Sequence, residues 1–285
     1  MFRTLAGPAP SIALPKGTID CHMHLFDSRY PEPKEGPAGP AHDAPISDYQ
    51  QLQTWLGIDR VVIVQGNAYH KDNRCTLDAL AHYGDKARAV VAVDVSITDD
   101  ELQKMTQLGV RGARIMDLLQ GAVGLDEMLE VNARVQPFGW SLIIQFDGRS
   151  IVERAPLLEQ IQGDYVIDHI GKFLRPVSPD SNEFHSLLRL IDRGNCYVKI
   201  AACYETSLSG HPKYDDVALL AKALIEHAPE RVIWGTNWPH LMSQSAQTYP
   251  DDRHLVDLAN SWAGSPANRQ KLFVDNPARL YGFTS

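Results

Sequence analysis

The sequence predicts a (β/α)8 barrel, the α/β fold also called a TIM barrel, formed as a single domain by residues 1–285. Short apolar runs rich in β-branched residues alternate eight times with longer helical patterns. Two of these runs, Val61-Val-Ile-Val64 and Val90-Val-Ala-Val93, are apolar on both faces, which is typical of parallel strands covered by helices. A polar residue ends nearly every run, and a barrel places its active site at those ends.

The strands and helices follow one another in regular order along the chain. The first strand lies within residues 17–26, between a glycine and a proline-rich loop. The patterns predict further strands over residues 60–67, 87–94, 110–116, 141–146, 165–171, 197–202 and 231–237. They predict helices over residues 47–56, with Ser47 as the N-cap, and over 76–83, 99–108, 125–135, 151–161, 184–191, 217–227, 254–262 and 266–281.

A doubly wound open sheet is the rival fold for this alternation of strands and helices. It is the weaker interpretation because no glycine-rich phosphate loop opens a helix after any predicted strand. The 285 residues contain no internal repeat, low-complexity tract or linker that would divide them. These observations favour one barrel over two smaller units.

The composition narrows the classes of protein that the chain can be. The formal net charge is −8, from 27 Lys and Arg against 35 Asp and Glu. This balance disfavours a nucleic-acid partner, because phosphate backbones need basic surface. The four cysteines have no CxxC spacing and are expected to be reduced thiols. Without a signal peptide or a run of about 20 apolar residues, we expect a cytoplasmic protein with no membrane partner.

Two histidines stand at the end of the first strand. His22 and His24 are two residues apart, so on a strand they lie on the same face and can point at one site. Paired histidines at a strand end serve metal binding or catalysis more often than packing. The simpler interpretation is a strand with two ordinary histidines.

The other strands also end in residues that can carry chemistry. The candidates are Gln65, Asn67, His70, Asp94, Arg114, Gln145, Asp147, Asp168, His169, Lys172, Lys199, Asn237 and His240. Each alone has a plain structural explanation, with Asp94 and Asp168 as loop caps, the amides as partners of backbone groups, and the cations as paired or solvated charges. Their convergence on one barrel mouth favours a site instead.

Four stretches of the sequence resemble the amidohydrolase superfamily. They are Ile19-Asp-Cys-His22-Met-His24, Val166-Ile-Asp-His169-Ile-Gly, Val232-Ile-Trp-Gly-Thr-Asn237-Trp-Pro-His240 and Asn276-Pro-Ala-Arg-Leu-Tyr281. Within that superfamily the chain is most similar to the lactonase group that includes 2-pyrone-4,6-dicarboxylate lactonase. The resemblance extends over almost the whole chain, from about Gly17 to Tyr281, and implies an enzyme that acts on lactones.

Asn237 departs from the family pattern. The resemblance implies Gly-Thr-Asp-Trp-Pro-His at this place, with an aspartate that takes a proton from the attacking water and, in metal-dependent members, binds the metal. Asparagine has no titratable carboxylate and cannot be a general base. The residue is either a natural departure or an engineered Asp→Asn substitution.

A natural asparagine changes the reaction that the resemblance implies. When water is poorly activated, a hydroxyl group of the substrate becomes the competing nucleophile at the lactone carbonyl. Its attack produces a different lactone instead of an opened acid, as in members of this group that interconvert the 1,5- and 1,4-lactones of galactarate. The leading hypothesis is therefore a lactone isomerase whose substrate is an aldaric acid monolactone.

Within this hypothesis, three cations hold the free carboxylate of the substrate through charge-assisted hydrogen bonds: Arg114, Lys172 and Lys199. Family members carry an arginine at the position of Lys172, so bidentate binding is lost there. The remaining predicted binding residues are polar side chains at the strand ends, namely Gln145, Asn67 and His70.

The catalytic roles in this hypothesis belong to histidines. His169 takes the proton from the attacking hydroxyl and returns it to the departing ring oxygen. The carbonyl is polarised by His22, His24 and His240 as negative charge develops on its oxygen. We expect no metal ion or other cofactor, because a well-aligned internal nucleophile can reach an effective molarity of about 10⁵ M or more.

Three other hypotheses remain open. The chain could be a lactone hydrolase with another residue as base, or a metal-dependent decarboxylase, against which Asn237 argues. It could also be a sugar-acid binding protein without catalysis. The sequence predicts no oligomeric state, and the loop over residues 27–45 either covers the barrel mouth or contacts another subunit.

Overall fold

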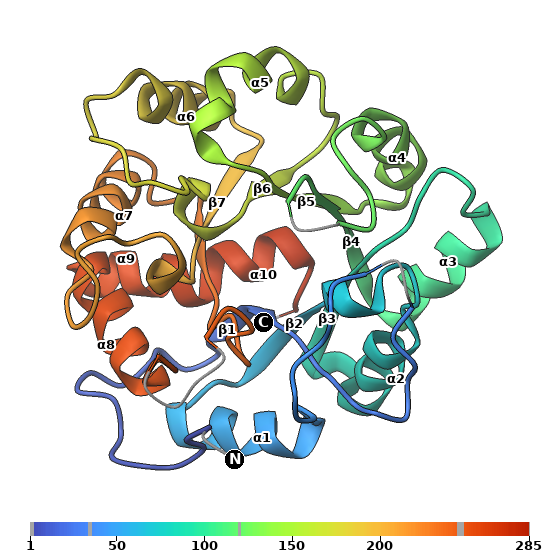
Figure 1. The fold of residues 1–285 in the computed structure, drawn as a ribbon, viewed down its shortest axis with the longest axis horizontal. Helices are drawn as coiled ribbons and strands as arrows, with labels where there is room; N and C mark the ends of the chain where they lie inside the picture. The colour runs from blue at the N-terminus through green and yellow to red at the C-terminus, as the bar shows by residue number, and fades with distance from the viewer. Residues whose placement is uncertain (1–2, 34–35, 119–120, 244–247, 285) are drawn as a thin grey trace.

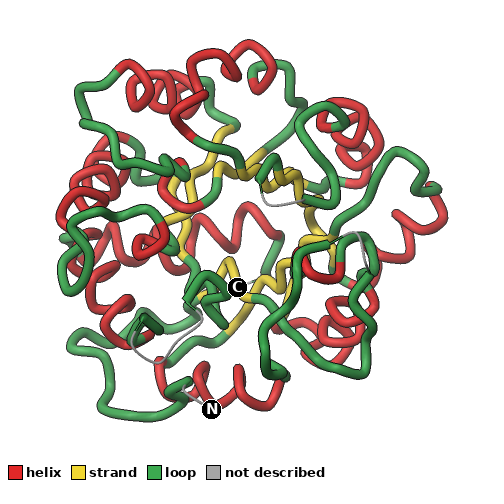
Figure 2. The backbone as a smooth tube through the Cα atoms, in the orientation of Figure 1, coloured by secondary structure: helices red, strands yellow, loops and turns green. Residues whose placement is uncertain are grey.

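Eight parallel strands form a barrel with helices around its outside, as the tube in Figure 2 makes plain. The structure is a computed structural model that describes residues 3–33, 36–118, 121–243 and 248–284. The strands neighbour one another in sequence order, from β1 to β8. The chain after β8 returns to β1, where the His24 amide donates to the Trp238 carbonyl over 2.8 Å. The predicted (β/α)8 barrel is confirmed, and the doubly wound sheet is excluded.

The strands are short and the helices lie between them along the chain (Figure 1). The strands are β1 (Ile19–Met23), β2 (Arg60–Val64), β3 (Ala87–Val91), β4 (Val110–Met116), β5 (Ser141–Gln145), β6 (Tyr165–Ile167), β7 (Cys196–Ile200) and β8 (Val232–Trp234). The α-helices are α1 (Ile46–Leu56), α2 (Arg74–Tyr83), α3 (Asp99–Leu108), α4 (Met128–Val135), α5 (Ile151–Leu158), α6 (Asn182–Asp192), α7 (Asp215–His227), α8 (Asp252–Ala263), α9 (Pro266–Gln270) and α10 (Asn276–Tyr281).

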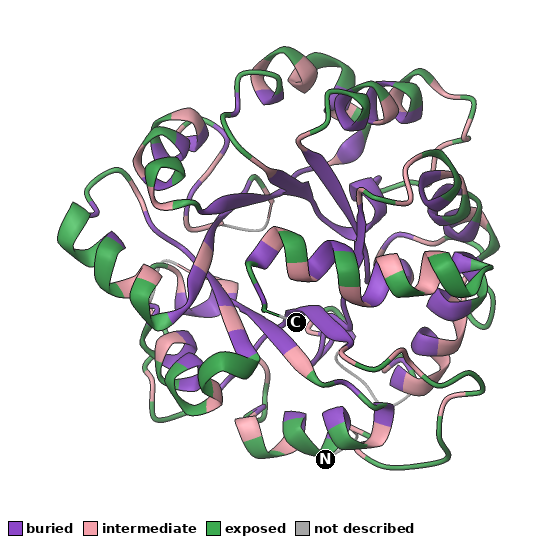
Figure 3. Ribbon diagram, turned by 180° about the vertical axis from the view of Figure 1, so that it is seen from behind, coloured by how far each residue is buried: buried purple, intermediate pink, exposed green. Residues whose placement is uncertain are grey.

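The apolar core has two parts. The larger part lies between the strands and the surrounding helices, and the smaller part lies inside the barrel. Figure 3 shows the strands buried over most of their length and α10 lying across the end of the barrel that faces the viewer. Tyr281 and Phe283, at the end of this helix, pack with interior residues such as Val62 and Ile143. The amino-terminal end of the barrel is therefore filled, and chemistry is confined to the other end.

Several predicted boundaries are wrong in ways that have a physical cause. The helix expected to start after a Ser47 cap begins at Ile46, and its N-cap is Pro45, so Ser47 lies inside the first turn. The strand expected over residues 165–171 ends at Ile167, because the backbone turns into a left-handed conformation at His169. By contrast, the helix expected over 266–281 has the predicted bounds and continues through α9, a π-helical turn and α10.

The helix predicted over residues 99–108 matches α3 at both ends, and its caps explain the agreement. The Thr98 hydroxyl accepts from the Glu101 amide, while the Glu101 carboxylate accepts from the Thr98 amide. Gly109 adopts a left-handed conformation at the C-terminus, which ends the helix. Within the described ranges, no helix combines the length and the apolarity that crossing a membrane requires.

Candidate active site

Left-handed backbone conformations mark the mouth of the barrel. Among the described non-glycine residues, eight have positive φ, and all but Tyr214 lie after the carboxyl ends of four strands: His70, then His169, Ile170 and Lys172, then Ala202, and Asn237 and His240. Such a conformation is costly for an L-residue and persists only where the surrounding structure enforces it. These turns direct the side chains that follow each strand toward one site.

His22 and His24 are joined in a hydrogen-bond chain that fixes both tautomers. His24 Nδ1 donates to the Val64 carbonyl over 2.9 Å, so His24 Nε2 is an acceptor when the ring is neutral. His22 Nε2 lies 3.1 Å from it and must be the donor. His22 Nδ1 then accepts from Lys199 Nζ over 2.9 Å. The Val64 carbonyl at one end of this hydrogen-bond chain and the Lys199 ammonium at the other require the same pair of tautomers.

Both imidazoles are neutral in this environment. Burial lowers the pKa of His24 to about 3, and the Arg114 charge acts in the same direction. Burial and the Lys199 ammonium hold the pKa of His22 well below its usual range. With both His22 nitrogens occupied, this ring cannot act as a general base.

Lys199 and Asp168 form a fully buried ion pair, with Nζ 2.8 Å from Oδ1. Burial alone would raise the pKa of Asp168, but the Lys199 charge together with the contributions of His22 and His169 outweighs it and keeps the pKa well below the usual range. Two expectations change as a result. Asp168 does not cap a loop, and Lys199 is already engaged by a carboxylate, so it is poorly placed to hold that of a substrate.

The donor atoms near this pair do not fit a bound metal ion. Within the described part of the chain, one group of histidine and acidic residues, His22, Asp168 and His169, brings its ligand atoms within 4.8 Å of one another. The Lys199 ammonium contacts both His22 and Asp168, so a divalent cation there would face a positive charge at contact distance. His22 would also lose a lone pair that already accepts a hydrogen bond.

Asn237 lies in a second cluster, which includes residues that follow β6 and β7. Its amide nitrogen donates to the Tyr204 hydroxyl over 2.7 Å and to Glu205 Oε1 over 2.9 Å. Glu205 also forms an ion pair with Lys172, and both side chains are less than a tenth exposed. Burial opposes ionisation of Glu205, but the Lys172 charge, His169 and the hydrogen bonds from Lys172 and Asn237 together outweigh it and lower the pKa. Lys172 is therefore paired within the protein, like Lys199.

His240 does not reach the mouth directly. It is fully buried, with Nε2 2.9 Å from Asp252 Oδ1 and Nδ1 2.7 Å from the Tyr204 hydroxyl. The expected contact of His240 with a lactone carbonyl is therefore not supported, and His240 contacts Tyr204, a half-buried residue, instead.

His169 has the features expected of a base. Its Nδ1 is buried and has no hydrogen-bond partner among the residues that the structure describes. Burial lowers the pKa of His169 to about 4, so the ring is neutral near pH 7. The ring lies 4.9 Å from that of His22.

Arg114 is the cation best placed to hold a substrate carboxylate. It donates to the Gln65 carbonyl over 2.6 Å and to Gln145 over 3.3 Å, and no ion pair involves it in the described structure. It lines a small cavity of about 10 Å³ together with Gln65, Asn67 and His70. Three of the predicted binding residues, Arg114, Asn67 and His70, therefore meet at one cavity, and Gln145 contacts Arg114.

The remaining strand-end residues have structural roles. Gln65 donates to two carbonyl groups of the following turn, at 3.2 and 2.9 Å. Asp94 accepts from the Ser96 amide and pairs with Lys71, which confirms its expected loop role. Asp147 accepts from the Arg149 amide and forms an ion pair with that side chain.

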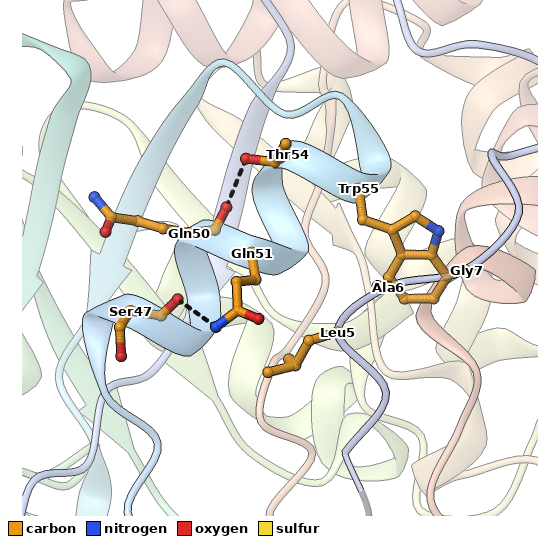
Figure 4. A pocket seen from close by; sticks show the side chains of 8 residues that line it. All are labelled: Leu5, Ala6, Gly7, Ser47, Gln50, Gln51, Thr54 and Trp55. Atoms are coloured by element: carbon orange, nitrogen blue, oxygen red, sulfur yellow. Dashed lines mark hydrogen bonds between the residues drawn. The ribbon is translucent and has the colours of Figure 1, made fainter.

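A surface hollow that includes none of the predicted site residues lies between the N-terminal segment and α1 (Figure 4). It is lined by Leu5, Ala6, Gly7, Ser47, Gln50, Gln51, Thr54 and Trp55. None of these side chains is an acid or a base, so the hollow has no group that could activate the hydroxyls of Ser47 and Thr54 for catalysis.

Sequence reasoning missed four residues that hold the site together: Asp20, Tyr204, Glu205 and Asp252. Asp20 is buried in β1 and accepts from Tyr49, Thr236 and the His22 amide, which ties β1 to the end of β8. Glu205 and Tyr204 follow β7 as the other candidates follow their strands. This position after a strand was the sequence signal that could have identified them. Asp252 gave no signal, because it starts a helix distant from any strand end.

These features define an enzyme of the (β/α)8-barrel class, with a buried histidine and lysine site at the carboxyl ends of its strands. Residues 19–283 match the amidohydrolase family model, and the chain belongs to the amidohydrolase family. The chain is 43% identical to the D-galactarolactone isomerase of Agrobacterium fabrum, over 99% of this chain and 96% of that protein.

Lactone hydrolases are also relatives. The chain is 34% identical to the 2-pyrone-4,6-dicarboxylate hydrolase of Comamonas testosteroni, over 95% of this chain and 92% of that protein. An apo crystal structure from Agrobacterium tumefaciens superposes with a TM-score of 0.96 and 42% identity, over 99% of both chains. The similarity thus includes the whole barrel.

Proposed function

We propose that this protein is a lactone isomerase that converts D-galactaro-1,5-lactone to D-galactaro-1,4-lactone. The observation that carries the proposal is the amide of Asn237, which lies where family members have a water-activating aspartate and donates hydrogen bonds instead of accepting a proton. The D-galactarolactone isomerase at 43% identity supports the same reaction, and its name supplies the substrate.

The reaction is an intramolecular acyl transfer. A substrate hydroxyl attacks the lactone carbonyl, the bond from the carbonyl carbon to the ring oxygen breaks, and one proton passes from the attacking to the departing oxygen. The proposed proton acceptor is His169, because its Nδ1 is buried and has no partner within the described residues. No other reactant is required.

The free carboxylate of the substrate binds Arg114, beside Asn67 and His70. The neutral rings of His22 and His24 lie behind the reacting carbonyl. Their mutual hydrogen bond and the hydrogen bond from Lys199 to His22 hold them in place. The proposed reaction needs no metal ion, since the lysine already supplies positive charge at that place. The four cysteines are free thiols, in keeping with the proposed action in the cytoplasm.

The local geometry also supports Asn237 as a natural residue. An aspartate there would place its carboxylate against the carboxylate of Glu205, at the contact that the amide now makes over 2.9 Å. Two buried carboxylates at that separation cannot both ionise easily. The neighbourhood is therefore suited to an amide.

A proton NMR time course tests the proposal. The protein is mixed with freshly prepared D-galactaro-1,5-lactone, with and without a metal chelator. Growth of the 1,4-lactone ahead of the open diacid, at the same rate with chelator, is the expected result. Direct formation of the diacid would instead identify a lactone hydrolase, the reaction named for the relative at 34% identity. Lactone binding without turnover would indicate a binding protein.

A further inference from the structure

We propose that Tyr204 is a second proton-transfer residue of this site, whose hydroxyl protonates the departing ring oxygen while His240 and Asp252 supply a proton behind it. The inference rests on the proposed isomerisation. It assigns a proton donor, which the departure of a poor leaving group such as an alkoxide requires.

The three side chains form a line from the protein interior to the mouth. Asp252 Oδ1 lies 2.9 Å from His240 Nε2, and His240 Nδ1 lies 2.7 Å from the Tyr204 hydroxyl. Asp252 and His240 are buried, whereas Tyr204 is partly exposed. A carboxylate that orients an imidazole, which in turn contacts a hydroxyl, is the arrangement of a catalytic triad.

The hydrogen bonds of Tyr204 determine where its proton points. Its oxygen accepts from the Asn237 amide over 2.7 Å. When His240 is an imidazolium, Nδ1 also donates to this oxygen, and the phenolic hydrogen is then directed away from both partners. The carboxylate of Asp252 stabilises that imidazolium as a buried pair. Tyr249, whose ring lies 4.9 Å from that of His240, is the other titratable side chain in ring contact with it.

The proton balance of the proposed step is complete. The attacking oxygen bonds to the carbonyl carbon and gives its proton to His169. The ring oxygen leaves and takes the proton of Tyr204, and Tyr204 receives the Nδ1 proton of His240. Exchange with solvent restores both histidines, and the reverse reaction uses the same groups in opposite roles.

The hydrogen bond from Asn237 to Tyr204 affects the phenolic proton of Tyr204. An aspartate at its place would accept a hydrogen bond from Tyr204 and hold the phenolic proton. The amide donates instead, which leaves that proton available to the substrate and favours negative charge on the phenol oxygen. Burial raises the pKa of Tyr204, so the phenol is protonated near pH 7.

The decisive comparison uses two substrates with different leaving groups. One is the 1,5-lactone, and the other is the 4-nitrophenyl monoester of galactaric acid, in which a substrate hydroxyl displaces a phenolate that needs no proton. For Y204F we expect lactone turnover to fall by about 10² to 10⁴. Its turnover of the ester, with the uncatalysed rate subtracted, should stay within about threefold of the unmodified protein.

Two variants complete the experiment. Y30F is the matched control, because the Tyr30 hydroxyl donates to Asp78 outside the site, and both activities should persist. D252N keeps the Tyr204 hydroxyl and should show the same lactone-selective loss, which tests the positioning residues even if Y204F does not fold. Equal loss of both activities in Y204F, or no loss, would overturn the proposal. A wild-type protein inactive on the lactone would instead disprove the isomerase function itself.

Discussion

The side-chain amide of Asn237 lies 2.9 Å from the carboxylate of Glu205, so two residues 32 positions apart in the sequence form one hydrogen-bonded unit at the mouth. Replacing the amide by a carboxylate would turn an attraction into a repulsion. We expect N237D to lower the free energy of unfolding at pH 7 by about 1–3 kcal/mol. Urea unfolding measures this change.

A double-mutant cycle tests the cause of that loss. E205Q removes the opposing charge, so N237D/E205Q should recover part of the stability that N237D loses. Additive losses would show that repulsion between the two carboxylates is not responsible.

Arg114 should control binding more than chemistry. R114K keeps the charge but loses the planar fork that binds a carboxylate with two hydrogen bonds. We expect KM for the lactone to rise by about tenfold or more, with a smaller change in kcat. R74K is a matched control, because Arg74 is an exposed arginine that pairs with Asp72. A KM unchanged in R114K would place the substrate carboxylate elsewhere.

His169 should set the acid limit of activity. Its pKa is lowered to about 4, and only the neutral imidazole can accept a proton. Above about pH 5 His169 stays neutral, so its titration should not change the turnover. Turnover should fall as the pH drops through about 4. Steady-state rates over this range measure the effect, and H169Q should lose at least about 10² in kcat. An acid limit near pH 6.5, the ordinary value for histidine, would contradict this assignment.

Stability should also decline in acid, because the mouth histidines are buried in neutral form. The pKa of His24 is 6.5 in the ordinary case and about 3 in the fold. Below pH 6.5 the unfolded chain therefore binds a proton that the folded chain does not. The unfolding free energy should fall by up to about 1.4 kcal/mol per pH unit for each such histidine. Chemical unfolding at pH 7, 6 and 5 measures the slope, and H24N should reduce it.

The Lys199–Asp168 pair should be the costliest ion pair to break. K199M leaves a fully buried carboxylate without its cation, and we expect a loss of about 3–5 kcal/mol. K71M breaks the partly exposed pair with Asp94 and should cost less than about 1 kcal/mol. Thermal unfolding compares the two variants. Equal losses would mean that burial adds nothing to the pair.

The sequence was sufficient to predict the barrel, because apolar β-branched runs such as Val61–Val64 are determined locally. It also identified the residues that end the strands, since strand direction alone brings them to one mouth. It did not predict the partners of Lys172 and Lys199. Those pairings depend on how turns after different strands meet, and an isolated lysine has the same local pattern whether it is paired or not.

The dependence on tertiary contacts also explains why the sixth strand is predicted to end too far along the chain. The predicted sixth strand continued to residue 171 because its composition stays apolar, yet the chain leaves the sheet after Ile167. Residues 169–172 all have positive φ, and no local sequence pattern predicts this conformation.

The turn over residues 169–172 positions site residues at a cost in the stability of the fold. Ile170 is a buried β-branched residue held at φ 56°, a conformation in which glycine would be at ease. Glycine would relieve this backbone strain, but I170G would also remove a side chain from the apolar core and leave a cavity. The loss of packing outweighs the relief of strain, so I170G should unfold at a lower temperature and should also hold His169 and Lys172 less firmly.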